Sequence, residues 1–287
     1  MANLKEIRNR IASVSSTMQI TSAMKMVSAA KLKKAQDAII AMRPYSSILT
    51  KLIQNLSGSL DGDIPNPYTM IRNEKNILIV SITSNRGLCG AFNSNIVKKT
   101  RHLIEETYAS QKVSLITIGK KGSEILSKIG KVESSHDSIF DELTYINVGF
   151  IAQELMEKYE EKEYDKVILV YNRFKNAATQ IVEEESYLPI VAKRGEEIDT
   201  NTDYIFEPNK SEIIKELLPK SLKMQLFKAL RDSFASEHGA RMTAMHKATD
   251  NATELRDQLK LTYNKARQAA ITNEILEIVG GAEALNT

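Results

Sequence analysis

Residues 4–18 read LKEIRNRIASVSSTM, and their apolar side chains recur at alternating steps of three and four residues. This repeat is the spacing of a coiled-coil seam, along which one edge of a helix packs against a second helix. The seam consists of Leu4, Ile7, Ile11, Val14 and Met18. The stretch therefore predicts a long N-terminal helix that has a helical partner.

The apolar stripe changes register further along this segment, where it passes to Ile20, Met24 and Val27. Such a shift predicts a local change of supercoil or a different neighbour. Pro44 lacks the amide hydrogen that a helix interior uses, so a kink is expected near Arg43.

A second seamed helix is predicted at the C-terminal end. Its seam consists of Leu255, Leu259, Thr262, Ala266 and Ala269. This helix is expected to begin after Pro208 and to stop at Gly280 and Gly281. A helix of about 70 residues would extend on the order of 100 Å, so it needs a partner along its length. Two such helices at opposite ends of one chain bury both seams if they pair antiparallel.

Glycine divides the chain into three parts. Residues 1–57 contain no glycine, residues 211–279 contain only Gly239, and nine of the twelve glycines lie between 58 and 210. Since glycine is unfavourable inside helices and common in turns, the chain is predicted to consist of two coiled-coil helices, 1–57 and 211–287, and a central α/β domain, 58–210.

The central part alternates between predicted strands and predicted helices. Strands are expected at 76–83, 113–118 and 166–171, and helices at 93–108, 121–129 and 147–161, with further edge strands near Ile181 and Tyr204. Alternation of this kind favours a parallel sheet with helices on its faces, which is a Rossmann-like arrangement.

Composition excludes several classes of protein. Hydrophobic residues make up 42% and charged residues 26%, which is ordinary for a globular chain, and no apolar run reaches the ~18 to 20 residues of a membrane-spanning helix. The single cysteine, Cys89, allows no internal disulfide and no all-cysteine metal site. The start of the chain resembles neither a signal peptide nor a transit peptide, so we expect a bacterial protein that stays where it is made.

The turn at residues 84–90 joins a predicted strand to a predicted helix, where phosphate sites often form. It lacks the third glycine of GxGxxG and has no Gly-Lys-Ser/Thr. We therefore interpret Gly87 and Gly90 as glycines of a structural turn, selected for backbone angles and close packing. Residues 119–123 carry a weaker version of the same pattern. Neither turn predicts a cofactor, and Cys89 is interpreted as a packed small residue.

A net charge of +7 falls on residues 1–57, against −5 on 58–210 and +1 on 211–287. The basic residues Lys25, Lys31, Lys33 and Lys34 could form a solvated helix face or bind a partner. Nucleic acid is disfavoured because this segment has only Tyr45 for stacking on bases, and lipid because the apolar stripe has no Trp or Phe anchor. A protein partner is the best of the three.

Four stretches of this sequence resemble the γ subunit family of F-type ATP synthases. The closing run, residues 271–284 (ITNEILEIVGGAEA), is the most specific. The others are residues 11–14 with 20–27 (IASV and ITSAMKMV), residues 86–90 (RGLCG), and residues 240–242 with 248–251 (ARM and ATDN). Asn85 replaces an acidic residue that is common in that family.

The resemblance implies an antiparallel coiled coil of both termini with an α/β domain between them. It also implies a function that periodicity cannot show, the central rotor shaft of a proton-translocating ATP synthase. The coiled coil would stand inside a ring of three α and three β subunits, and the α/β domain would sit with the ε subunit on the c-ring. Rotation of the c-ring would then drive ATP synthesis at the β subunits. The chain would be non-catalytic, without cofactor, metal or nucleic acid, and held through its partners at the cytoplasmic face of the inner membrane.

The resemblance also assigns contact residues. Arg267, Gln268 and Thr272 match polar positions that touch the β subunits, and Met24 and Arg241 match positions near an acidic β segment. Lys25 is added on its charge. The tip, namely Gly281, Ala282, Glu283, Ala284 and Leu285, would sit in an apolar bearing of the ring. The surface that meets ε and the c-ring is placed near Asp203 to Glu207.

Two alternatives from other classes remain open at this point. One is an α/β nucleotide-binding enzyme with helical arms, which would act through the turn at residues 86–90. The other is a basic coiled-coil scaffold that binds nucleic acid, which would show salt-dependent binding of DNA.

Overall fold

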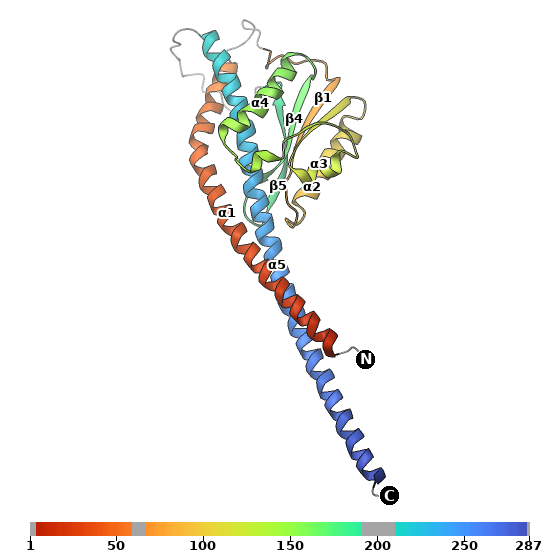
Figure 1. Cartoon of the computed structure of the whole chain (residues 1–287). Coiled ribbons are helices and arrows are strands. Elements are labelled where there is room, and N and C mark those ends of the chain that lie inside the picture. The colour runs from red at the N-terminus through yellow and green to blue at the C-terminus, as the bar shows by residue number, and fades with distance from the viewer. Residues whose placement is uncertain (1–3, 59–66, 191–209, 286–287) are drawn as a thin grey trace. The chain divides into compact units, whose positions relative to one another are not determined.

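The computed structural model describes residues 4–58, 67–190 and 210–285. The predicted strand near Tyr204 and the surface placed near Asp203 to Glu207 lie outside these residues. Two long helices, α1 (Leu4–Gly58) and α5 (Lys210–Leu285), enclose the strands and shorter helices in the sequence. Figure 1 shows the elements in their order along the chain. Within the described residues, no helix is both long enough and apolar enough to span a bilayer.

The chain divides into two compact units. One contains residues 1–28 and 242–287, and the other contains residues 29–241. The second unit therefore includes the C-terminal half of α1 and the first part of α5. We call the first unit the helical pair and the second the α/β unit.

The α/β unit contains a five-stranded sheet in the order β3-β2-β1-β4-β5. The strands are β1 (Asn76–Ile82), β2 (Lys112–Ile118), β3 (Lys131–Ser135), β4 (Lys166–Phe174) and β5 (Gln180–Leu188). β1, β2, β3 and β4 are parallel to one another, and β5 pairs antiparallel with β4. The predicted parallel α/β arrangement is confirmed, with the predicted strand near Ile181 as its antiparallel edge.

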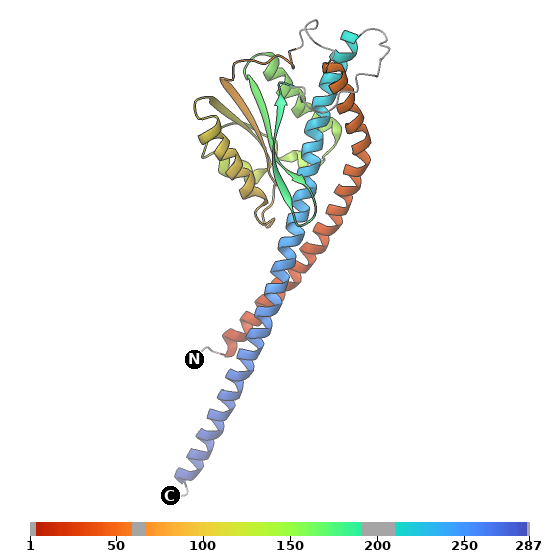
Figure 2. The ribbon, with the colours of Figure 1, turned by 180° about the vertical axis from the view of Figure 1, so that it is seen from behind.

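Helices cover both faces of this sheet. Figures 1 and 2 show α2 (Phe92–His102) and α3 (Lys120–Leu126) on one side, and α5 on the other with α4 (Tyr145–Glu160). Alternation along β1 explains the two layers, because Ile77 and Ile79 pack with α2 whereas Leu78 and Val80 pack with α4 and α5. Two short helical turns, Leu103–Thr107 and Ser138–Phe140, complete the unit.

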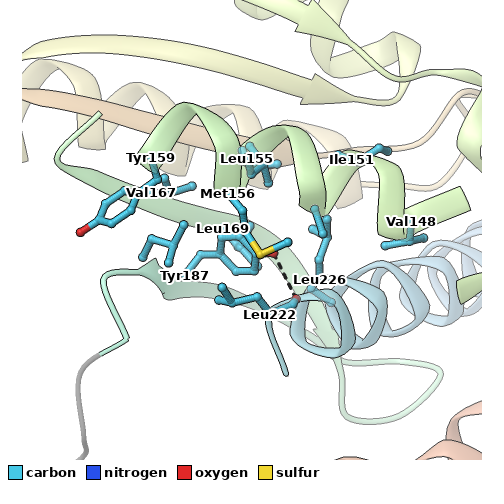
Figure 3. Packing of buried hydrophobic residues seen from close by; sticks show 14 of the residues in the cluster. Val148, Ile151, Leu155, Met156, Tyr159, Val167, Leu169, Tyr187, Leu222 and Leu226 are labelled. Carbon is cyan, nitrogen blue, oxygen red and sulfur yellow. Dashed lines mark hydrogen bonds between the residues drawn. The ribbon is translucent and has the colours of Figure 1, made fainter. Parts of the chain in front are cut away.

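The first part of α5 is a structural layer of the α/β unit. Leu222 and Leu226 of α5 are fully buried against β4, β5 and α4, as Figure 3 shows. The hydroxyl of Tyr187 in β5 donates a hydrogen bond to the carbonyl of Leu222 at 3.1 Å. Since Tyr187 is wholly buried, this bond satisfies a polar group that would otherwise destabilise the core.

Both long helices run through residues that were expected to disturb them. α1 continues past Pro44, and α5 continues through Gly280 and Gly281 to Leu285. The predicted stop at Gly280 and Gly281 is wrong. A glycine inside a helix costs only about 0.5–1 kcal/mol relative to alanine, and the residues that follow, Ala-Glu-Ala-Leu, are strong helix formers.

Gly239 of α5 provides a test of this packing. A Cβ at Gly239 would lie 3.2 Å from both the Cα and the carbonyl oxygen of Ala177, in the turn between β4 and β5. We expect Gly239→Val to lower the free energy of unfolding by about 2 kcal/mol, because a branched side chain there must displace backbone. The matched change Gly149→Val, where the nearest atom is the flexible Lys223 Cδ at 3.8 Å, should stay within about 0.5 kcal/mol. Urea denaturation of both variants gives the comparison, and equal stabilities would contradict the packing.

Candidate partner-binding surface on the helical pair

The two helices of the helical pair run antiparallel. Three cross-helix hydrogen bonds set the register: Arg8 Nη2 to the Tyr263 hydroxyl at 2.8 Å, Thr21 Oγ1 with Thr249 Oγ1 at 2.8 Å, and Lys25 Nζ with His246 Nδ1 at 3.3 Å. As the residue number rises along α1, it falls along α5. The predicted antiparallel coiled coil is confirmed.

The seam of α1 keeps its register, and the predicted shift is wrong for Ile20 and Val27, whereas Met24 is half-buried. Ile20 is 60% exposed and Val27 is 57% exposed, whereas Thr21 and Ser28 are buried at 8% and 3%. The seam therefore continues from Met18 through small polar residues, which the apolar pattern could not reveal. The Thr21 hydroxyl bonds locally to the Met18 carbonyl and across the pair to the Thr249 hydroxyl.

The seam of α5 also differs from the prediction. Leu255 is 47% exposed, and Thr262 and Ala269 are exposed as well, so of the predicted set only Leu259 and Ala266 face the pair. Arg256 and Tyr263 take the vacated seam positions, where Arg256 Nη1 contacts Met18 Sδ at 3.4 Å and Tyr263 bonds Arg8. Long side chains with polar ends can pack their apolar stems in a seam, and a count of apolar residues misses them.

The end of α5 extends beyond the start of α1 (Figures 1 and 2). Since Arg8 pairs with Tyr263, residues 4–7 of α1 reach only as far as about Ala266. Every side chain that the structure describes from 267 to 282 is exposed. The large apolar ones are Ile271, Ile275, Leu276, Ile278 and Val279.

This apolar end indicates a missing partner. Large exposed apolar patches on a protein mark interaction sites, and a single helix in water is only marginally stable without tertiary packing. The polar residues Arg267, Gln268 and Thr272 lie at the start of this end and are exposed, and within the described residues none of the three side chains bonds another. Gly281 and Ala282 are exposed too, and the side chains from 283 to 285 lie outside the described set.

The remaining predicted contact residues on α1 lie where the two helices pack. Met24 is half-buried, and Lys25 is held by His246. Of the other basic residues in this part of α1, Lys33 forms an exposed ion pair with Asp37 at 2.9 Å, whereas Lys31 and Lys34 are exposed. The structure therefore brings Met24 and Lys25 together on α1 but not with Arg267, Gln268 and Thr272, which lie about six turns away along α5.

Arg241 does not lie on a free surface, which corrects its expected place as a direct contact residue. It is 7% exposed, within the α/β unit. Its guanidinium donates to the Glu237 carboxylate at 2.6 Å and to the carbonyl oxygens of Arg86 at 2.9 Å and Gly87 at 3.3 Å. A buried arginine with these bonds is committed within the chain. Its sequence neighbourhood gave no signal for this, because the accepting carbonyls lie about 155 positions away.

The interpretation of the turn after β1 as structural rests on two reasons, namely backbone angles and close packing at Gly87 and Gly90. Gly90 has a φ of +60°, so the backbone-angle argument is confirmed there. Close packing is not found at either glycine, because a Cβ at Gly87 or Gly90 would meet no atom within 4 Å. Cys89 is buried, as interpreted, and burial raises the pKa of its thiol.

Protein groups occupy the backbone amides of the second glycine-containing turn, residues 119–123, which follows β2. The amide of Gly122, at the start of α3, donates to Thr83 Oγ1 at 2.9 Å, and the amide of Lys120 donates to Asn85 Oδ1 at 3.1 Å. A Cβ at Gly119 would lie 2.3 Å from the Thr83 carbonyl oxygen, so the chain itself fills this space. These amides are therefore not free to bind a nucleotide phosphate, which argues against a phosphate site at the turn after β2.

Two ionisable residues beside Arg241, Glu237 and His238, have pKa values that burial shifts away from the ordinary ones. Burial raises the pKa of the Glu237 carboxyl, although the adjacent Arg241 opposes this shift. Burial, with the positive charges of Arg241 and Lys31, lowers the pKa of His238 to about 3. His238 Nε2 is buried without a hydrogen-bond partner among the described residues, and its ring meets Phe234 edge to face at 4.5 Å. The imidazole is therefore neutral in the folded chain.

This neutral imidazole makes stability depend on pH. The unfolded chain binds a proton at His238 below its ordinary pKa of 6.5, and the folded chain does so only near pH 3. Stability contributed by this group is therefore complete above pH 6.5 and falls by up to about 1.4 kcal/mol per pH unit as the pH drops below it. We expect His238→Gln to lose less stability than the wild type between pH 7 and pH 5, measured by denaturant titration at each pH. Equal losses of stability in the variant and the wild type would show that His238 is not the cause of the pH dependence.

The chain consists of a helical pair and an α/β unit, and the apolar end of α5 has no partner among the described residues. These features define a subunit that completes its packing within a larger assembly. Comparison with known proteins agrees. A family model described as ATP synthase matches residues 3–285. The chain is 67% identical to the ATP synthase gamma chain of Flavobacterium johnsoniae and 53% identical to that of Cytophaga hutchinsonii, in each case over 100% of both chains. The chain therefore belongs to the ATP synthase gamma chain family.

Solved structures agree with this assignment. One similar chain comes from the central stalk and c-ring structure of the Tetrahymena thermophila mitochondrial ATP synthase. It has a TM-score of 0.61 and 27% identity, and the match covers 80% of this chain and 99% of that one. A chain in the Euglena gracilis mitochondrial ATP synthase, in rotational state 3, has a TM-score of 0.73 and covers 98% of this chain and 94% of that one. At 24% identity, the second match supports the fold alone.

Proposed function

We propose that this chain is the central rotor shaft of a proton-translocating ATP synthase, which transmits rotation of a membrane c-ring to three catalytic β subunits. The observation that carries the proposal is the exposed apolar end of α5, within a chain that matches ATP synthase gamma chains over its whole length. An end of this kind requires a surrounding partner, and a ring of three α and three β subunits provides one. The chain itself would be non-catalytic. Among the described residues, no group of three or more His, Cys, Asp or Glu side chains could hold a metal ion.

The mechanism follows from symmetry. A pair of helices has no threefold axis, so at any moment it contacts three chemically identical β subunits differently. Each contact favours a different conformation, and hence a different nucleotide affinity, in the subunit that receives it. Rotation of the shaft exchanges these states among the three subunits. The coupling works only through contacts that differ in free energy between the states, typically by about 1–3 kcal/mol.

Specific residues would make these contacts. Arg267, Gln268 and Thr272 would hydrogen-bond the β subunits at the start of the exposed end of α5, and the tip from 281 to 285 would turn in an apolar bearing. Met24 and Lys25 would face an acidic β segment. Lys25 Nζ lies 3.3 Å from His246 Nδ1, and the same His246 nitrogen lies 3.4 Å from an Asp250 carboxylate oxygen. The Lys25 ammonium group is therefore only partly available to a β subunit.

The α/β unit would sit with the ε subunit on the c-ring. The similar chain from Tetrahymena thermophila belongs to a structure of the central stalk together with the c-ring, which supports this placement. The chain would therefore be peripheral to the membrane, held at the cytoplasmic face of the bacterial inner membrane through its partners.

Reconstitution tests the proposal. This chain is mixed with purified bacterial α and β subunits, the stoichiometry is determined by native mass spectrometry, and Mg-ATP hydrolysis is assayed in the same sample. We expect one copy per three αβ pairs, together with stimulated hydrolysis. If well-folded, compatible α and β subunits form no complex with the chain, the proposal is wrong. ATP binding and salt-dependent DNA binding by the isolated chain then test the two alternatives.

A further inference from the structure

In the α/β unit, α5 packs at the carboxyl ends of β1 and β4, where open α/β sheets commonly bind a ligand. In open α/β sheets, ligands bind outside the carboxyl ends of the strands where the strand order reverses, which here is between β1 and β4. Ser236 of α5 donates a hydrogen bond to the carbonyl of Asn172 near the end of β4, at 2.9 Å. Ala240 of α5 is buried against Cys89 and Phe92, which follow β1. α5 therefore lies where a ligand of this fold would bind.

Arg241 closes this contact. Its guanidinium accepts no hydrogen bond and offers five donors in a planar fork. The fork joins two elements, because it reaches the carbonyl oxygens of Arg86 and Gly87 in the turn after β1 as well as the Glu237 carboxylate of its own helix. The side chains of Arg241 and Glu237 are buried, so water competes little for the bond between them, and the bonds to the Arg86 and Gly87 carbonyls are part-buried. A lysine could donate to one or two of the acceptors but could not span them in one plane.

The turn that Arg241 holds is itself unusual. Leu88 has a φ of +62°, a left-handed conformation that is rare for a leucine, and Gly90 follows with +60°. Such a conformation persists only when its surroundings impose it. The neighbouring Ser84 Oγ also donates to the Arg86 carbonyl, at 2.7 Å, so this carbonyl is held by the sheet end and by α5 together.

We propose that the crevice between β1 and β4 is a docking socket for α5, that Arg241 is the positioning residue that locks it, and that this lock transmits torque between the α/β unit and the helix. The torque part rests on the proposed rotor function. Arg241 is the last residue of α5 that belongs to the α/β unit, so the lock lies at the boundary of this unit along the helix. Without it, the unit could yield under load while the helices remained paired.

Hydrogen exchange on the isolated chain tests the lock without any partner. The variants are Arg241→Lys and the milder Glu237→Gln, and the matched control is Lys247→Gln, an exposed charge six positions further along α5. Loss of charge-assisted bonds should accelerate exchange in segment 84–95 by about tenfold or more in Arg241→Lys, and by less in Glu237→Gln. The control should exchange like the wild type. Wild-type exchange in both variants overturns the lock, and if Arg241→Lys does not fold, Glu237→Gln decides alone.

Proton pumping in the assembled ATP synthase tests the torque part. The ratio of protons pumped to ATP hydrolysed is measured in membrane vesicles, so that a change in hydrolysis rate alone does not alter the result. We expect this ratio to fall severalfold in Arg241→Lys and to stay at the wild-type value in Lys247→Gln. A wild-type ratio in Arg241→Lys overturns the torque part. If the wild-type chain fails to assemble, the proposed function fails, while the exchange experiment still decides whether the lock exists.

Discussion

Replacing Arg267 and Gln268 together by alanine is expected to lower coupled ATP synthesis by about tenfold or more. Both side chains are exposed at the start of the unpartnered end of α5, and among the described residues neither bonds another. In the assembly they would bond polar groups of the β subunits, and removal would leave those groups buried without partners. A lost bond to a charged group costs about 1.5–3 kcal/mol, which is at least a factor of ten in a rate or a binding constant.

The measurement is ATP synthesis in energised membranes, with circular dichroism of the isolated chain as the control for folding. Alanine is the best helix former, so helicity should not fall. A matched double variant, Lys260→Ala with Asn264→Ala, removes the same charge and a similar amide from exposed positions that the proposal does not use. Normal synthesis in the Arg267 and Gln268 variant, or an equal loss in the matched variant, would show that these residues are not the contact.

The second large effect is on stability. We expect Gly119→Ala to lower the free energy of unfolding by about 3 kcal/mol or more. Gly119 has a φ of +106°, and its Cβ would lie 2.3 Å from the carbonyl oxygen of Thr83. Both the backbone conformation and the space exclude a side chain, and these costs add. Thr83 cannot retreat easily, since its hydroxyl bonds both the amide of Gly122 and the carbonyl of Gly119.

Gly87→Ala is the matched control for this change. It lies in the neighbouring turn, where a Cβ meets no atom within 4 Å and φ is not in the left-handed range. The free energy of unfolding of Gly87→Ala, measured by urea denaturation, should stay within about 0.5 kcal/mol of the wild-type value. A folded Gly119→Ala with wild-type stability would mean that the strand end and α3 are not packed as described.

The sheet was predictable where strands are buried on both faces. β1 and β4 are runs of Val, Ile and Leu, and burial of such runs requires helices on both sides. β3 was missed because its sequence, KVESS, has one apolar residue and is only half-buried. β5 was seen only as a weak edge near Ile181, since the acidic run at 183–185 masks its alternation. Edge strands expose one or both faces, so their composition resembles that of a loop.

The site was predictable in outline but not in its register. Periodicity located both helices and their pairing, yet it assigned Ile20, Val27 and Leu255 to the interior, where the chain instead uses Thr21, Ser28 and Arg256. Thr21 and Arg256 have contacts across the pair for their polar groups, at Thr249 and Met18 respectively. Only the three-dimensional pairing supplies that information. The same reason explains Arg241, whose bonding partners are backbone carbonyls that no residue pattern encodes.

Direct observation of rotation tests whether this chain turns within the ring of α and β subunits. A complex of α and β subunits with this chain is fixed to a surface, and a bead is attached to the chain through Lys98→Cys, an exposed position on α2. Cys89 is only 2% exposed, so labelling should be confined to the introduced thiol. We expect ATP-driven rotation in one direction with three pauses per turn, one for each β subunit. A bead that stays still while the same complex hydrolyses ATP would contradict it.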